Sequence, residues 1–401
     1  GLRGESYAAL TSDGAWCWFG DPRAVFHEGE HRRTYAGFVT SSGDLALAQF
    51  DHDSREVTSA VVKEQLQQDD RASPAVVVRP DHRLMVFYSG HRGRWMIYRI
   101  SANAEDVTSW GEPHAASGHT SEFSGHTYPN AVLLAGENGR RYVFWRGAKS
   151  LPMFAFSETG LSWSEPDVLI RGDGERPSVK MASDGGSTIH FAFTNGHPGD
   201  EPANSIYYVC YRNGVFRRAD GSSVGTMEDL PLAFEDADLV YDAAGAGARA
   251  CLWDVAFDPS GNPVIAYAVF PSVEDHRYRY ARWGGAAWVD TEIAPAGAWF
   301  PTVEKGRRHF APYYSGGMAL DHSDPSIVYL SRPVDGVFEI ERWTTRDDGR
   351  SWTSEAVTSG SVSNNVRPLV PLGHASDGPG LIWMNGTYVD YANYSTSLRM
   401  K

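Results

Sequence analysis

The chain has 401 residues, a mass of 44.1 kDa, a formal net charge of −14 and a pI of about 5.4. This acidic balance argues against a nucleic-acid-binding protein, which normally carries a basic excess. The sequence contains no apolar run long enough to predict a membrane span. Its three cysteines do not suggest a disulfide framework. Aromatic residues make up 12% of the chain, which suits the core of an all-β protein or stacking on sugars.

A short unit recurs seven times along the chain. Two copies, LWDVAFDPSGNPVIAYAV and SGGMALDHSDPSIVYLS, consist of an apolar run, a turn and a second apolar run. In the other five copies the first run is opened by a proline: Pro22, Pro74, Pro129, Pro177 and Pro368. Seven copies of a strand–turn–strand unit predict an all-β, seven-bladed β-propeller with four-stranded antiparallel blades.

We expect a single propeller domain over residues 1–401. The long acidic segment between the fourth and fifth units is expected to be an excursion near the rim. The last unit looks short, so residues 1–15, with the run ESYAALTS, are expected to supply its outer strand and close the ring. The blades are expected at roughly 16–58, 72–113, 127–168, 175–218, 250–293, 315–357 and 366–400.

The sixth unit carries TRDDGRSW, residues 345–352, a near match to the Asp-box turn. In such turns the aspartate caps the backbone and the tryptophan packs between strands. We therefore expect Asp347 and Trp352 to be structural residues.

The repeat also predicts which side of the ring is the working face. In antiparallel strands, the start of the first strand and the end of the second lie on the same side. His91 follows Pro74 by as many residues as Arg146 follows Pro129, so both should lie at this mouth. Five arginines are expected there, Arg71, Arg146, Arg176, Arg332 and Arg367.

Guanidinium groups bind carboxylates or sulfates in a bidentate manner, so these arginines predict a pocket for an acidic ligand. The alternative is that each arginine pairs with a carboxylate of the protein. The candidates for such pairing are Asp69, Asp70, Asp254 and Asp321.

Seven stretches carry a resemblance to a known family: WCWFGDPRAV, DDRASPAVVV, FYSGH, TYPNAVLL, YVFWRG, ERPSVKMAS and IHFAFTNGHP. Their order and spacing, over nearly the whole chain, resemble the BNR-repeat propellers of polysaccharide degradation. That group includes ulvan lyases, gum-arabic rhamnose–glucuronate lyases and a related rhamnosyl-glucuronate hydrolase. The resemblance implies a propeller that cleaves at a uronic acid.

The lyases of this family use two histidines, a tyrosine and an arginine. The resemblance assigns the second histidine to His91, the tyrosine to Tyr128 and the arginine to Arg146. The first histidine falls in a DDH motif, where this chain has Arg71. In the hydrolase that histidine is the proposed catalytic group. The family motif RPYVK is also altered, with Ser178 in place of tyrosine.

A uronate lyase must neutralise the carboxylate, remove the C5 proton and protonate the leaving oxygen. Arg146, with Arg71, can neutralise the carboxylate, and His91 can be the base. Tyr128 can donate to the leaving oxygen, or act as a base if the arginines lower its pKa. Arg71 stays protonated and cannot be a base. The expected substrate-binding residues are Arg71, His126, Arg176, His197, Arg332 and Arg367.

The predicted function is a lyase acting on a rhamnose–uronate linkage, with an acidic polysaccharide or oligosaccharide as its partner. The alternatives are a rhamnosyl-glucuronate hydrolase and a carbohydrate-binding propeller that lacks catalysis because of Arg71. The sialidase class, which also has Asp boxes and an arginine cluster, fits the motif order less well. We expect a secreted or periplasmic monomer that binds neither nucleic acid nor membrane.

No cofactor is required by this chemistry, and no metal is expected at the catalytic site. A structural calcium or zinc ion is considered. For zinc, the candidate ligands are His190 and His197 together with Cys210 or Cys251.

Overall fold

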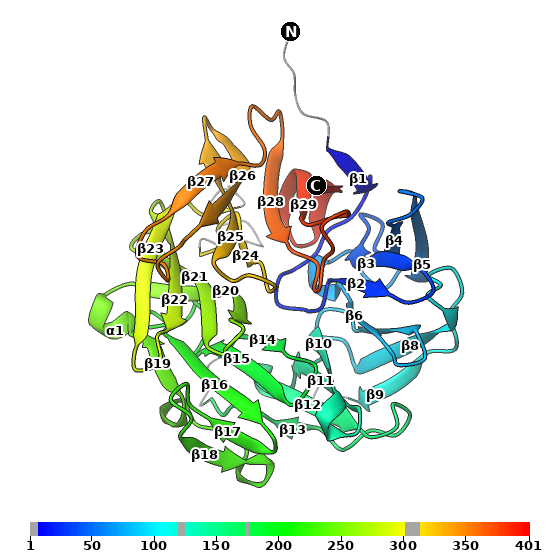
Figure 1. Cartoon of the computed structure of the whole chain (residues 1–401), viewed down its shortest axis with the longest axis horizontal. Coiled ribbons are helices and arrows are strands. Elements are labelled where there is room, and N and C mark those ends of the chain that lie inside the picture. The colour runs from blue at the N-terminus through cyan, green and yellow to red at the C-terminus, as the bar shows by residue number, and fades with distance from the viewer. Residues whose placement is uncertain (1–6, 119–124, 173–175, 301–312) are drawn as a thin grey trace.

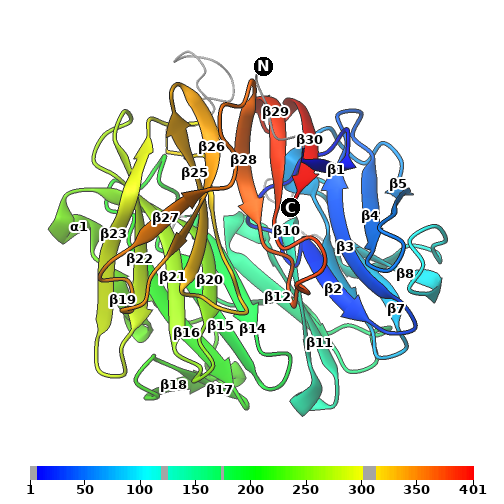
Figure 2. The ribbon, with the colours of Figure 1, turned by 45° about the horizontal axis from the view of Figure 1, so that its top comes forward.

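The computed structural model describes residues 7–118, 125–172, 176–300 and 313–401. Seven antiparallel sheets stand around a central axis (Figure 1), and a tilted view shows them as the blades of one ring (Figure 2). This confirms the predicted seven-bladed propeller. No helix in the described ranges is long and apolar enough to cross a membrane.

Each of the first three blades is a four-stranded sheet whose strands follow the chain. Blade 1 contains β2 (Ala24–Glu28), β3 (Arg32–Val39), β4 (Leu45–Asp51) and β5 (Val57–Lys63). Blade 2 contains β6 (Ala75–Val78), β7 (Arg83–Tyr88), β8 (Trp95–Ala104) and β9 (His114–Gly118). Blade 3 contains β10 (Thr127–Leu134), β11 (Arg140–Arg146), β12 (Pro152–Ser157) and β13 (Asp167–Val168).

Blade 4 is larger than the others because the acidic excursion adds two strands to it. Both β18 and β19 join this sheet, β18 by pairing with β17 and β19 by pairing with β16. Residue 175, the expected start of this blade, lies outside the described residues. The elements of the blade and its excursion are β14 (Val179–Ser183), β15 (Thr188–Thr194), β16 (Ile206–Arg212), β17 (Val215–Arg217), β18 (Ser223–Thr226), β19 (Asp238–Tyr241) and α1 (Ala243–Ala246).

The last three blades have four strands each. Blade 5 contains β20 (Arg249–Phe257), β21 (Pro263–Phe270), β22 (His276–Trp283) and β23 (Trp288–Gly297). Blade 6 contains β24 (Met318–Leu320), β25 (Ile327–Val334), β26 (Val337–Thr344) and β27 (Thr353–Ala356). Blade 7 contains β28 (Asn364–Leu369), β29 (Ile382–Asp390), β30 (Asn393–Met400) and, from the N-terminal region, β1 (Ala8–Thr11). Short 3-10 helices occur at Asp70–Ala72, Ala135–Glu137, Ala148–Ser150, Met227–Asp229 and Phe234–Asp236.

Strand β1 closes the ring by pairing with β30, so a strand from the beginning of the chain covers the edge of the last blade. This removes an edge whose unpaired backbone groups could join another sheet. Of the expected ESYAALTS run, Glu5 and Ser6 lie outside the described residues, and the strand itself is Ala8–Thr11.

The Asp-box turn of blade 6 has the expected structural role. Asp347 Oδ1 accepts hydrogen bonds from Thr345 Oγ1 (2.9 Å) and from the backbone of Ser351 (2.8 Å). Trp352 packs edge-on against Tyr280 of blade 5, with ring centroids 5.0 Å apart. The turn therefore ties blade 6 to its neighbour and lies away from the inner strands.

The closure predicts the effect of one substitution in β1. Leu10 is buried in the core, whereas its neighbour Ala9 is exposed. Truncating a buried leucine costs about 2–5 kcal/mol, so Leu10→Ala should lower the free energy of unfolding by an amount in this range. Chemical denaturation of Leu10→Ala and of the control Ala9→Ser measures the effect. Equal stability of the two variants would contradict the packing of β1.

Candidate active site

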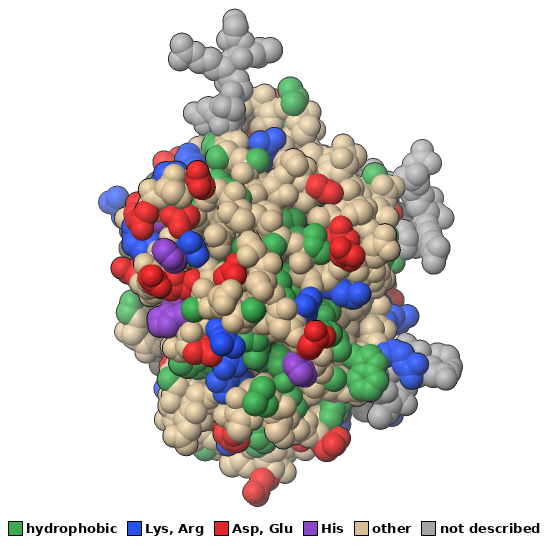
Figure 3. Space-filling view, turned by 90° about the vertical axis from the view of Figure 1, so that its right-hand side faces the viewer, with side chains coloured by type: hydrophobic (Ala, Val, Ile, Leu, Met, Phe, Trp, Pro, Cys, Tyr) green, Lys and Arg blue, Asp and Glu red, His purple; other side chains and the backbone are tan. Residues whose placement is uncertain are grey.

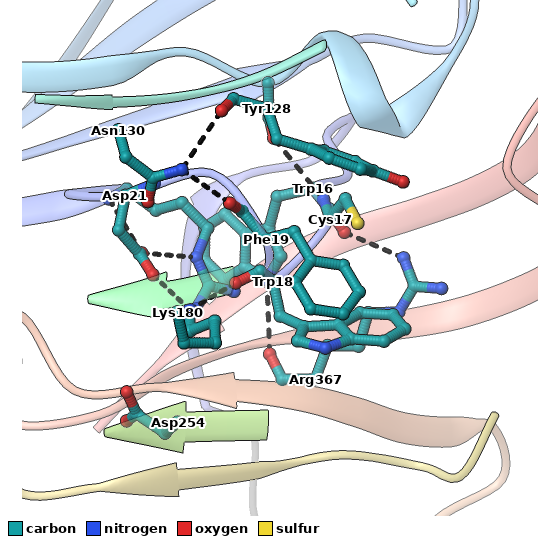
Figure 4. A network of polar contacts seen from close by, with 12 residues as sticks. Trp16, Cys17, Trp18, Phe19, Asp21, Tyr128, Asn130, Lys180, Asp254 and Arg367 are labelled. Atoms are coloured by element: carbon teal, nitrogen blue, oxygen red, sulfur yellow. Dashed lines mark hydrogen bonds and ion pairs between the residues drawn. The ribbon is translucent and has the colours of Figure 1, made fainter. Parts of the chain in front are cut away.

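Residues 16–21, WCWFGD, hydrogen-bond to four blades and to the short helix that precedes blade 2, and Figure 4 shows these residues from close by. We call them the axial segment. Its contacts are Trp16 Nε1 to the Arg367 carbonyl (3.2 Å), Cys17 N to the Asp70 carbonyl (3.1 Å), Trp18 Nε1 to the Leu252 carbonyl (2.9 Å), Asn130 Nδ2 to the Phe19 carbonyl (2.8 Å) and Lys180 Nζ to the Trp18 carbonyl. The segment thus provides a common floor on which side chains from different blades meet.

Three blades turn a side chain toward this floor through an irregularity in the inner strand. The pairing register shifts around Tyr128 in β10, Trp253 in β20 and Arg367 in β28. Tyr128 and Arg367, each followed by proline, have φ values of 62° and 51°. Bulges of this kind re-aim side chains, and they recur beside active sites. Here Tyr128 packs on Phe19 (5.5 Å between centroids) and Trp253 stacks on Trp18 (4.0 Å).

His91 is held by a buried carboxylate. Asp69 caps the short helix Asp70–Ala72 by accepting from the backbone of Arg71 (2.9 Å), and its other oxygen lies 2.7 Å from His91 Nδ1. An adjacent carboxylate favours the tautomer in which Nδ1 carries the proton. His91 Nε2 is then an acceptor, and it lies 3.4 Å from Arg146 Nη2.

Two guanidinium groups surround this imidazole. Arg146 lies over the ring of Tyr128, with 4.8 Å from Cζ to the centroid, and Arg71 lies over the ring of Tyr391 at 3.6 Å. Within the described part of the chain, neither arginine forms an ion pair with a carboxylate. Burial, together with the charge of Arg71, lowers the pKa of Arg146. A bound anion would relieve the repulsion between these two cations.

The protonation states follow from burial. Burial lowers the pKa of His91, and the positive charges of Arg71 and Arg146 act in the same direction, although Asp69 opposes them. Burial raises the pKa of Tyr128, and the two arginines do not offset it. At neutral pH the imidazole is therefore neutral and the phenol protonated. This favours a proton-donating Tyr128 over the alternative of a tyrosine base.

Two other predicted residues lie at the edge of this site. His197 Nε2 is 3.3 Å from the hydroxyl of Tyr314, whose ring packs edge-on against Trp18 of the axial segment. Burial lowers the pKa of His197 to about 3, so this ring is neutral. Arg176 forms an ion pair with Asp200, which leaves its guanidinium partly neutralised.

Three predicted substrate-binding residues have structural partners instead. Arg332 forms a bidentate pair with Glu341 of its own blade (2.7 and 3.0 Å). Arg367 is buried and donates to Asp70 (2.6 Å), as the alternative of pairing with a carboxylate predicted. His126 is buried, lies 3.1 Å from Ser117 Oγ through Nε2, and its ring lies tilted against that of Trp145 with centroids 5.0 Å apart. The prediction of a five-arginine pocket is therefore wrong, and of the five only Arg71 and Arg146 have no carboxylate partner in the part of the chain that the structure describes.

The zinc site considered from the sequence does not form among the described residues. His190 Nδ1 lies 2.6 Å from the Tyr208 hydroxyl, and its ring stacks on Phe257. Cys210 and Cys251 are buried free thiols, and no grouping of possible metal ligands in the described ranges includes them.

Sequence reasoning did not assign a role to several residues that build the site. The sequence predicts Asp69 only as a possible arginine partner and predicts no role for Tyr314 or Tyr391. Asp69 could have been suspected, because it stands two residues before the helix position of Arg71, where aspartate commonly caps. The two tyrosines lie outside the inner strands, so the repeat does not predict their positions.

A small cavity of about 30 Å³ adjoins Tyr128 and Arg146 between blades 3 and 4. Ser178 forms part of its wall. A tyrosine at this position, as in the family motif, would place a bulky side chain at this wall.

The pairing of His91 with Asp69 predicts a change in titration. Because the carboxylate raises the pKa of the imidazole, Asp69→Asn should lower the pKa of His91 below its value in the unmodified protein. NMR titration of the histidine Cε1 proton, assigned with His91→Gln, measures this change. The exposed His31 serves as an internal control. An unchanged or higher pKa would contradict the pairing.

Comparison of the structure with solved structures reveals related propellers. A PL25 ulvan lyase superimposes with a TM-score of 0.74 at 15% identity, covering 99% of this chain and 95% of that one. The same type of enzyme bound to -[GlcA(1-4)Rha3S]- gives a TM-score of 0.73 at 14% identity, covering 100% and 94%. The polysaccharide lyase Uly1 gives 0.61 at 12% identity, covering 99% and 98%. At these identities the likeness establishes the fold.

Sequence comparison gives the family. No curated protein matches the sequence. The model described as "BNR repeat-containing family member" matches residues 33–296, which is more than half of the chain. The chain therefore belongs to the BNR repeat-containing family.

Proposed function

We propose that this protein is a polysaccharide lyase that cleaves a rhamnose–uronic acid linkage by β-elimination. The observation that carries the proposal is the position of His91. Its neutral imidazole, oriented by the buried Asp69, directs Nε2 toward Arg146 in a site where two guanidiniums have no carboxylate partner within the described ranges. Such a site offers a base beside a binding place for an anion.

The two arginines would bind the uronate carboxylate. Arg71 and Arg146 both approach Tyr128, and each influences its titration. A carboxylate placed between them would receive charge-assisted hydrogen bonds. Neutralising the carboxylate makes the neighbouring C5 proton more acidic, because the charge that develops in the transition state is stabilised. Arg71 in place of a histidine would thus add binding charge rather than a second base.

His91 and Tyr128 would move the protons. His91 Nε2 takes the C5 proton, the C5–H electron pair forms the C4=C5 double bond, and the C4–O bond breaks. The leaving oxygen takes its proton from the Tyr128 hydroxyl, which burial keeps protonated. The products are a 4,5-unsaturated uronate and a new reducing end. The proton on His91 then returns to Tyr128 through solvent.

Among the described residues, the carboxylates near the site support a lyase over a two-acid glycosidase. Asp69 is engaged by His91 and by the backbone of Arg71. Asp70 is buried between Arg367 and Tyr388. A glycosidase of that type needs two carboxyl groups that flank the scissile bond. The structural neighbours, a PL25 ulvan lyase and such a lyase bound to -[GlcA(1-4)Rha3S]-, agree with the proposed substrate class.

We also propose that the partner is an extracellular acidic polysaccharide, met by a secreted or periplasmic monomer. The proton transfers above use side chains of this chain alone. The net charge of −14 would repel a polyanion over most of the surface. Binding would then be confined to the mouth that holds Arg71 and Arg146.

The proposal predicts activity on ulvan or gum arabic, followed by the ultraviolet absorbance of the unsaturated uronate. His91→Gln and Tyr128→Phe should each lower kcat by about 10²–10⁴-fold, the usual contribution of a proton-transfer group. Arg342→Ala, in an exposed pair with Glu355, is the control and should retain activity. Full activity in either site variant would contradict the assigned roles. Free rhamnose without new absorbance would indicate the hydrolase, and binding without products would indicate a carbohydrate-binding protein.

The pH dependence follows from the pKa of His91. Only the neutral imidazole can act as a base, and its pKa lies below the usual value of 6.5. We therefore expect kcat/KM to be level around neutral pH and to fall as the pH drops below this pKa. A profile of kcat/KM against pH checks this, and an acidic limb centred above 6.5 would contradict it.

Arg71 provides a test of carboxylate binding. Arg71→Ala and Arg71→His should both weaken binding of ulvan by about tenfold or more, because a charge-assisted hydrogen bond contributes about 1.5–3 kcal/mol. Calorimetry measures the affinity. Carboxyl-reduced ulvan is the matched control ligand, and the variants should bind it almost as tightly as the unmodified protein does. Higher activity in Arg71→His would instead indicate a decayed histidine site.

A further inference from the structure

Two histidines and a glutamate converge at a place separate from the candidate active site. His27 lies on β2, His82 in the turn between β6 and β7, and Glu105 directly after β8. These are the far ends of the strands, on the face opposite His91. Among the described residues they form the one grouping of three such side chains whose ligand atoms lie within 4.8 Å of one another.

The distances fit a tetrahedral metal ion. His27 Nε2 lies 3.0 Å from His82 Nδ1 and 3.4 Å from Glu105 Oε1, and His82 Nδ1 lies 3.7 Å from the same oxygen. Zinc binds nitrogen and oxygen at about 2.0–2.2 Å, so the edges of its tetrahedron measure about 3.3–3.6 Å, a range that the three observed separations bracket. Two imidazoles and one carboxylate are also a known three-ligand zinc set.

The glutamate is held in place before any ion binds. Glu105 is buried, and its two oxygens accept hydrogen bonds from the backbones of Glu30 and His31, both at 2.9 Å. Hydrogen bonds to a ligating carboxylate orient it and raise metal affinity. Glu105 and His82 also have left-handed φ values of 55° and 60°. Such conformations cost energy for residues other than glycine, and they gather at ligand sites.

A glycine leaves room beside the three ligand atoms. A β-carbon at Gly29 would lie 1.7 Å from Glu105 Oε1 and 2.8 Å from both His27 Nε2 and His82 Nδ1. Any other residue at this position would place an atom among the three ligand atoms. Gly29 therefore keeps the space that they face open.

We propose that His27, His82 and Glu105 bind one Zn²⁺ ion, with water as the fourth ligand. The ion would join blade 1 to blade 2 and stabilise their contact. Figure 3 shows the side of the molecule to which these two blades belong, where histidine side chains reach the surface among acidic and basic ones. Because His82 is half exposed, an ion can reach the site from solvent. This inference is independent of the proposed lyase activity.

Metal binding is tested on the full chain without a polyhistidine tag. After treatment with a chelator and dialysis, calorimetric titration with ZnCl₂ should give one ion per chain and raise the thermal midpoint. Co²⁺ in its place should give the intense visible absorption of a tetrahedral site. Absence of stoichiometric binding by either metal would overturn the proposal and leave a hydrogen-bonded histidine pair.

Variants locate the ion. His82→Asn keeps a residue that tolerates a left-handed φ, and His27→Gln changes a second ligand. Each should weaken Zn²⁺ binding by more than about 100-fold, since even residues behind the ligands contribute 10–100-fold. His31→Ala, which removes an exposed neighbouring imidazole, should bind as the unmodified protein does. Circular dichroism verifies folding. Equal affinity in the ligand variants, or loss of binding only in His31→Ala, would contradict this site.

Discussion

The structure depends on the axial segment, residues 16–21, because it is where the separate blades are joined at the centre. A propeller blade contacts mainly its two neighbours, so residues in distant blades have no direct means of fixing their relative positions. The axial segment hydrogen-bonds to blades 3, 4, 5 and 7 and to the short helix that precedes blade 2. Its aromatic rings then pack beneath Tyr128, Trp253 and Tyr314. The site can be preorganised because its floor is one continuous piece of chain.

The arginines expected around that floor fall into two groups: those paired with a carboxylate of the protein and those that could bind a ligand. Arg367 is neutralised by Asp70, Arg332 by Glu341 and Arg176 by Asp200. Arg71 and Arg146 lie over aromatic rings, and among the described residues neither has a carboxylate partner, so both positive charges remain available to an anionic ligand. On a protein of net charge −14, this concentrates positive charge at one mouth. The two guanidiniums could neutralise the carboxylate of a uronate beside the neutral imidazole of His91 and the protonated phenol of Tyr128.

The repeat in the sequence was enough to predict the number of blades and the closure by β1, since the proline positions and apolar runs indicate directly where strands lie. It also placed His91 and Arg146 at one mouth, because they stand at equivalent ends of second strands, and Tyr128 on the same side, at the start of a first strand. It failed for Arg332 and His126, because spacing does not tell which way a side chain points. The grouping of His27, His82 and Glu105 could not be predicted, since its members come from two neighbouring blades and meet only when those blades pack together.

The most direct test of the account is a crystal structure of the Tyr128→Phe variant with a rhamnose–glucuronate oligosaccharide. The account predicts the uronate carboxylate between Arg71 and Arg146, with C5 facing His91 Nε2 at a distance suited to proton transfer. A carboxylate bound elsewhere, such as in the pocket of about 180 Å³ near Asp254 and His322, would contradict it. So would a uronate in the site with C5 turned away from His91.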